Sequence, residues 1–189
     1  MKTASHTGLI RFFSRLARDV RAVSAVEFAL ILPIMITLFL GGTELSQAIA
    51  VKRKAVLVNR TIADLVSQDS TITTAEITSI FNASAAVVAP YSAAKLKIVV
   101  SGVKVDVNGV ATVDWSQAFQ ATARAVGSSV ALPTGINTPC ADPTKACLVF
   151  AETTYEYTPP IGYTIVGMLP LKDVMYMRPR KTASIACCT

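Results

Sequence analysis

Apolar residues fill the stretch from Ala22 to Thr43 almost without interruption, and Glu27 is its only charged residue. A helix of this length, rising about 1.5 Å per residue, reaches across the roughly 30 Å hydrocarbon core of a bilayer. Arginine and lysine residues flank the stretch on both sides, which is typical of membrane-spanning helices. The pattern therefore predicts a membrane helix whose spanning part is about 22–43.

Two residues inside this stretch are unusual for a simple anchor. Pro33 removes one backbone hydrogen bond and tends to kink a helix, which membrane helices tolerate where neighbouring helices cover the freed carbonyl. An unpaired carboxylate such as Glu27 costs a few kcal/mol on insertion scales. Both residues predict that the helix packs against other helices and that Glu27 has a partner or a function there.

The helical pattern continues beyond the apolar stretch. Residues 44–67 contain neither proline nor glycine, and apolar residues recur at helical spacing until the polar run 67–74 (SQDSTITT) ends the pattern. We expect one long helix over 23–67, preceded by a basic cytoplasmic leader at 1–22. The leader lies on the inner membrane surface as an amphipathic segment or is a retention signal that is later removed; its apolar residues are Leu9, Phe12, Phe13 and Leu16.

A second, shorter helix is predicted after the polar run. Thr73 followed by Glu76 matches a capping box, and the helix that it opens must stop near Pro90. Apolar and polar residues then alternate over residues 95–107, which is the pattern of a strand.

A hairpin turn follows that strand. Asn108-Gly109 between valine-rich runs favours a type I′ turn, because both central residues of such a turn need positive φ. We expect the returning strand at Val110–Trp115, a short helix at Ala118–Val126 and a loop at Gly127–Pro143. Alternation predicts a further strand at Cys147–Tyr157. Residues 68–189 are therefore expected to form a small extracytoplasmic α+β domain with an antiparallel sheet.

The net charge of +6 is confined to the neighbourhood of the apolar stretch. Residues 1–60 hold nine Lys/Arg and three Asp/Glu, whereas residues 61–189 hold nine of each. Basic residues beside a membrane helix face anionic headgroups and influence its orientation. Nucleic-acid binding is therefore excluded as an interpretation, because residues 61–189 contain no basic stripe with interleaved aromatic residues.

All four cysteines follow the apolar stretch. An even number of cysteines in a small domain is typical of disulfides in an oxidising compartment, which places the domain outside the cytoplasm. Three pairings are open, and the simplest joins neighbours along the chain. The disulfide candidates are Cys140, Cys147, Cys187 and Cys188.

The sequence predicts no catalytic, cofactor or metal site. The only histidine is His6, and the cysteine spacings do not match the paired half-sites of zinc centres. No glycine-rich phosphate loop, nucleophile elbow or paired-carboxylate motif is present. We therefore expect a protein that is not an enzyme and that takes no cofactor.

The stretch VSAVEFALILPIMITLFLGGTEL resembles the TadE-like family of pseudopilins from the tight-adherence (Tad or Flp) pilus system. The segments NGVATVDWSQA, TTYEYTPPIG and DVMYMRPR are similar to the same family, so the resemblance spans most of the chain. It implies a pseudopilin or minor pilin with an N-terminal assembly helix, in which Glu27, Phe28 and Pro33 belong to the helix bundle. The implied partners are a prepilin peptidase, other pilins or pseudopilins, the pilus assembly platform and inner-membrane lipid.

The resemblance also implies cleavage by the peptidase on the cytoplasmic face. In the family motif a glycine precedes the cut and a glutamate is the fifth mature residue, so the cut falls between Ala22 and Val23, with Glu27 fifth. Ala22 departs from the glycine of the motif. The mature protein is then expected in the bacterial inner membrane, as a single-pass protein with its domain in the periplasm or incorporated into an extracellular pilus.

Three other interpretations stay open. An uncleaved envelope-anchored accessory protein of the pilus machine is favoured by the absence of glycine at position 22. A secreted domain with an ordinary signal peptide is compatible with the small residues at Ala48-Ile49-Ala50. A periplasmic hydrolase or binding module has only generic polar residues in its favour.

Overall fold

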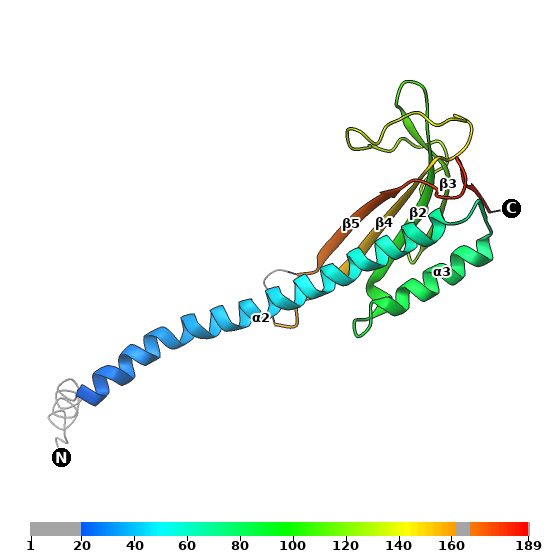
Figure 1. Ribbon diagram of the computed structural model, residues 1–189. Coiled ribbons are helices and arrows are strands. Elements are labelled where there is room, and N and C mark those ends of the chain that lie inside the picture. The colour runs from blue at the N-terminus through cyan, green and yellow to red at the C-terminus, as the bar shows by residue number, and fades with distance from the viewer. Residues whose placement is uncertain (1–19, 162–166, 189) are drawn as a thin grey trace, which may run out of the picture. The chain divides into compact units, whose positions relative to one another are not determined.

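The computed structural model describes residues 20–161 and 167–188, and the side chains among them from residue 23 on (Figure 1). Most of the predicted leader therefore lies outside the described residues.

The chain divides into two compact units, Met1–Leu45 and Ser46–Thr189. The elements follow in the order α2 (Val20–Ser67), β1 (Thr71–Ile72), α3 (Thr74–Val87), the 3-10 helix η1 (Ala93–Lys95), β2 (Leu96–Val105), β3 (Ala111–Phe119), β4 (Leu148–Tyr157), β5 (Leu169–Met177) and β6 (Ala186–Cys187).

The second unit is an α+β domain, as the sequence predicted. Four antiparallel strands form a sheet in the order β3-β2-β4-β5, and β1 pairs with β6 in a separate two-stranded parallel sheet. Helix α3 and the part of α2 from Ser46 onward cover one face of the larger sheet (Figure 1). The unit begins before the expected boundary at residue 68, because α2 contributes core residues from Val51 onward.

Helix α3 begins where the capping box predicted. The Thr73 hydroxyl accepts a hydrogen bond from the Glu76 backbone N–H at 3.3 Å, and the Glu76 carboxylate accepts one from the Thr73 N–H at 2.7 Å. The backbone hydrogen bond from Thr73, with a further one from its hydroxyl, lowers the pKa of Glu76. The helix ends at Val87, before Pro90, and buries Ile77 and Phe81.

Two hydrophobic clusters occupy opposite faces of the sheet. On the helix-covered face, apolar side chains of β2 and β4 pack against buried residues of α2, among them Val58, Ile62 and Val66. The other face has a smaller cluster near the β2–β3 turn, where the segment between β3 and β4 covers it and contributes Val130 and Cys140. Strand β2 therefore contributes side chains to both clusters by simple alternation.

A bulge in β3 directs its side chains to both faces. The pairs Gly102↔Trp115 and Val103↔Val113 leave Asp114 without a partner in β2. One extra residue reverses the alternation, so Val113 lies in the smaller cluster and Trp115 in the helix-covered core. The indole N–H of Trp115 donates a hydrogen bond to the Ile185 carbonyl at 3.3 Å.

The structure corrects the predicted hairpin turn. Asn108 does not have positive φ, and only Gly109 does, at 79°. The Asp106 carboxylate accepts hydrogen bonds from the backbone N–H groups of Asn108 and Val110, and the Asp106 N–H donates to the Val110 carbonyl. These bonds favour a three-residue loop closed by the glycine over a two-residue type I′ turn.

Two other expectations differ from the structure. The predicted helix at Ala118–Val126 is wrong, because β3 continues to Phe119 and residues 120–126 are not helical. Strand β5 was not predicted, although Leu169, Leu171, Met175 and Met177 alternate in the sequence. The predicted strand at Cys147–Tyr157 is confirmed by β4.

Replacement of Gly102 by alanine is expected to destabilise the second unit. A Cβ at this position would collide with the Trp115 indole and approach the Ala146 Cβ at 2.8 Å. Overpacking of this kind costs about 1–3 kcal/mol. Trp115 is the only tryptophan, so denaturant unfolding of the full chain in detergent, followed by its fluorescence, measures the free energy of unfolding directly.

Gly41→Ala is the matched control, because nothing lies within 4 Å of a Cβ at Gly41. We expect its unfolding curve to match that of the original chain. Equal stability of Gly102→Ala and Gly41→Ala would contradict the close packing of Trp115 on Gly102.

Candidate functional site

The described part of the first unit, residues 20–45, is helical and belongs to α2. Val23 and Glu27 lie in continuous helix four residues apart, so they occupy one helix face on successive turns. Glu27 and Pro33 are exposed, as is Phe28. Ala22 is helical, but its side chain lies outside the described side chains. The helix thus contains all five predicted processing and assembly residues.

The apolar side chains of this segment have no core of their own. Between Val23 and Phe39, large apolar residues are 38–72% exposed, and the consecutive residues Leu30, Ile31 and Leu32 are among them. Successive helical residues point about 100° apart, so the segment is apolar on all sides. A helix of this kind is stable in lipid or within a bundle of other helices.

Length and composition agree with a membrane location. Within the described ranges, α2 is the one helix long and apolar enough to cross a membrane, and its most apolar part is not buried within the structure. The Thr37 hydroxyl donates a hydrogen bond to the Pro33 carbonyl at 2.7 Å. The N-terminal helix is therefore a candidate single-pass membrane anchor.

The cysteines lie in two places in the second unit. The structure joins Cys140 to Cys147 and Cys187 to Cys188. The backbone N–H groups of Cys140 and Cys147 donate hydrogen bonds to the carbonyls of Val105 and Val103, each at 3.0 Å. The first pair thus attaches the loop before β4 to the end of β2.

Charged side chains of the second unit pair mainly with one another. The Arg124 guanidinium donates hydrogen bonds to both carboxylate oxygens of Glu152, at 2.5 and 2.8 Å, and the hydrogen bonds to Glu152 raise the pKa of Arg124. Arg124 also lies 5.2 Å from the Phe150 ring centroid. The sequence contained no signal for this group, because the fold brings Arg124, in the loop after β3, to Glu152 and Phe150 of β4.

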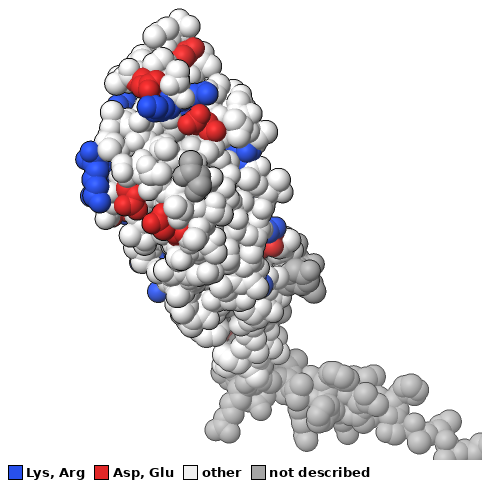
Figure 2. Space-filling model, turned by 90° about the vertical axis from the view of Figure 1, so that its right-hand side faces the viewer, with Lys and Arg blue, Asp and Glu red and all other residues white. Residues whose placement is uncertain are grey.

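The basic run near the C-terminal end also has partners within the unit. Arg180 forms an ion pair with Asp64 at 2.7 Å, and Lys181 lies 3.9 Å from Asp69. The face drawn in Figure 2 is mostly uncharged, with basic and acidic side chains interspersed. No group of three or more metal-ligating side chains occurs among the residues described.

These features define the class of protein: a chain in which an apolar helix, a candidate membrane anchor, continues into an α+β domain. Residues 22–63 match the model of the family described as TadE-like protein, which confirms the resemblance of the N-terminal motif; the three later segments lie outside the matched residues. The match covers the N-terminal helix and suggests involvement in the Tad pilus system. No curated protein and no solved structure matches the chain.

Removal of the Cys140–Cys147 bridge is expected to lower stability. Loop-closure entropy for a loop of this size, with a sequence separation of 7 residues, corresponds to about 2.5 kcal/mol. Denaturant unfolding of the full chain carrying Cys140→Ser and Cys147→Ser, compared with the original chain, measures this loss.

The variant Cys187→Ser with Cys188→Ser is the control, since a bridge between neighbours closes almost no chain. Its stability is expected to fall much less. Peptide mapping under non-reducing conditions checks the connectivity, and a bridge between Cys140 and either tail cysteine would contradict the pairing.

Proposed function

We propose that this chain is a pseudopilin or minor pilin that takes part in assembly of a Tad/Flp-type pilus through its N-terminal helix. The proposal rests on the overlap, along the chain, between the family match and the exposed apolar segment. The TadE-like match covers residues 22–63, and within it lies the apolar segment whose side chains are exposed on all sides. The family resemblance thus falls on the part of the chain that needs lipid or partner helices.

The apolar helix suits a protein that moves between lipid and a bundle of helices. Lipid tails are as apolar as leucine, so exchange of lipid for neighbouring helices has little hydrophobic cost. Gly41 and Gly42 leave open space around the backbone, and small residues allow helices to approach closely in membranes. A structural subunit can therefore be stored in the inner membrane and assembled from it.

Processing by a prepilin peptidase between Ala22 and Val23 would give Glu27 a partner. The cut creates an α-amino group at Val23, one helical turn from the Glu27 carboxylate. A pair between this carboxylate and an α-amino group, its own or a neighbour's, offsets the desolvation of both charges and fixes the register of packed helices. The anchor would place residues 46–189 in the periplasm, where the cysteines are oxidised.

A second candidate is a permanent anchor that supports the pilus machine without being cut. The observation in its favour is Ala22, which stands where the family motif has glycine. Both candidates share the membrane helix and the pilus partners. They differ in the covalent start of the mature protein.

The N-terminal residue of the mature chain distinguishes these candidates. We expect the protein from cell envelopes to begin at Val23 when the prepilin peptidase is present and to keep its leader when it is absent. Intact-mass and N-terminal sequencing provide the measurement. A peptidase-independent start at Met1 would favour the permanent anchor, and a start at Val51 would identify a secreted domain.

Glu27→Ala tests the assembly role of the carboxylate. We expect the variant to remain inserted in the membrane and to lose incorporation into pili by tenfold or more, because the α-amino group has lost its partner. Fractionation followed by immunoblotting of sheared pili measures both properties. Glu27→Gln is expected to fail similarly, since it lacks the charge.

Thr37→Ala is the matched control, an exposed residue of the same segment whose hydroxyl bonds only to the helix backbone among the described contacts. It is expected to assemble normally. Normal incorporation of Glu27→Ala would show that the carboxylate has no part in assembly.

A further inference from the structure

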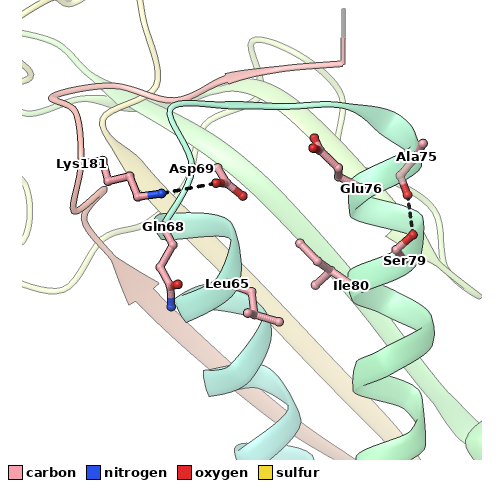
Figure 3. A pocket seen from close by; sticks show the side chains of 8 residues that line it. All are labelled: Leu65, Gln68, Asp69, Ala75, Glu76, Ser79, Ile80 and Lys181. Carbon is pink, nitrogen blue, oxygen red and sulfur yellow. Dashed lines mark hydrogen bonds and ion pairs between the residues drawn. The ribbon is translucent and has the colours of Figure 1, made fainter.

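A groove with an acidic rim lies between the end of α2 and the first turns of α3, within the second unit (Figure 3). Its volume is about 420 Å³. Leu65 and Ile80 form its apolar part, and Asp69 and Glu76 contribute carboxylates from opposite sides, while Lys181 also lines the groove beside Asp69. We call this feature the acidic groove; it has room for a few side chains of a partner.

The carboxylates of the acidic groove are available to an incoming cation. Hydrogen bonds from Thr73 lower the pKa of Glu76, so its carboxylate is ionised at neutral pH. The Asp69 side chain is 46% exposed, and its ion pair with Lys181 is long, at 3.9 Å. Exposed pairs of this kind contribute little free energy, so Asp69 can exchange Lys181 for another cation.

A complementary surface lies earlier on α2, also within the second unit. Ile49 and Leu57 are 46% and 48% exposed, and they flank Arg53 at intervals of four residues. Lys54 lies beside them, and no acidic residue lines the hollow between these side chains. We call this feature the basic stripe. Ile49, Arg53 and Leu57 form a ridge on one helix face, and Lys54, about 100° further round the helix, lines the same hollow.

We propose that the basic stripe of one copy of this chain docks into the acidic groove of a second copy. Apolar residues would meet Leu65 and Ile80, while Arg53 and Lys54 would meet the Asp69 and Glu76 carboxylates. Side-chain ridges of one helix fit grooves between others, and opposite charges favour this partner over a like-charged one.

The two surfaces give the contact a direction. Arg53 and Leu65 are twelve positions apart on α2, which is about 18 Å along a helix. Because the surfaces differ and lie at different places on each copy, the contact is heterologous and can repeat from copy to copy. The proposal concerns residues 46–189 alone and does not depend on cleavage at Ala22 or on the proposed pilus function.

Reciprocal charge reversal tests the contact in the full chain. The stripe variant carries Arg53→Glu and Lys54→Glu, and the groove variant carries Asp69→Lys and Ser79→Lys, which leaves the Glu76 cap intact. We expect the original chain in nonionic detergent to associate in sedimentation velocity as its concentration rises. Each variant alone is expected to associate at least about tenfold more weakly, as for loss of close charge pairs at an interface.

An equimolar mixture of the two variants is expected to recover pairwise association. The unchanged basic stripe of the groove variant then meets the unchanged acidic groove of the stripe variant, and the two reversed surfaces also carry opposite charges. The control carries Lys145→Glu and Arg178→Glu, which changes the net charge as the stripe variant does at exposed positions elsewhere. It should associate like the original chain. Trp115 fluorescence unfolding confirms that each variant is folded.

Three results would overturn the proposal. The first is an original chain that stays monomeric at every concentration. The second is a stripe or groove variant that associates as strongly as the original chain. The third is a mixture of the two variants that does not recover association. Failure to recover would indicate that the basic stripe serves an anionic lipid surface or an acidic segment of another protein. None of these results bears on the Val23 start or on Glu27, so the two proposals fail separately.

Discussion

The packing of α2 against the four-stranded sheet is the interaction on which the rest of the structure depends. One continuous helix carries two kinds of surface. Up to Leu45 its large apolar side chains are exposed, whereas from Val51 onward one face is buried in the core. Burial of a large aliphatic side chain contributes about 1.5–3 kcal/mol, so several such residues secure the helix to the sheet. Displacing α2 would uncover the sheet face that it covers.

The other features of the second unit follow from the need to cover both faces of the sheet. The bulge at Asp114 turns Trp115 toward the helices and Val113 toward the smaller cluster, and Gly102 makes the space that the indole requires. The Cys140–Cys147 bridge holds the loop before β4 over that smaller cluster. Arg180 and Asp64 connect the C-terminal segment with α2. The Arg180–Asp64 pair joins segments that are distant in the sequence.

This arrangement separates two tasks along one chain. The apolar segment has no core of its own and suits lipid or a bundle of helices, whereas the α+β unit is stabilised by its own core. Helix α2 belongs to both and connects the candidate membrane anchor with the domain.

The sequence by itself determined the elements that depend on local patterns. The apolar run, the uninterrupted helix to Ser67, the Thr73–Glu76 cap and the alternation of β2 and β4 are encoded by neighbouring residues, and so is the TadE-like motif. Only the tertiary structure decided the extension of β3 and the pairing of β5, because hydrogen bonds with neighbouring strands select these conformations. The turn after Asp106 depends on hydrogen bonds within residues 106–110, which the Asn-Gly pattern alone did not reveal. The acidic groove and the basic stripe were also decided by the tertiary structure. Helix packing brings Leu65 and Ile80 together and leaves Ile49 and Leu57 uncovered. No local pattern specifies which side of a helix a distant segment will occupy.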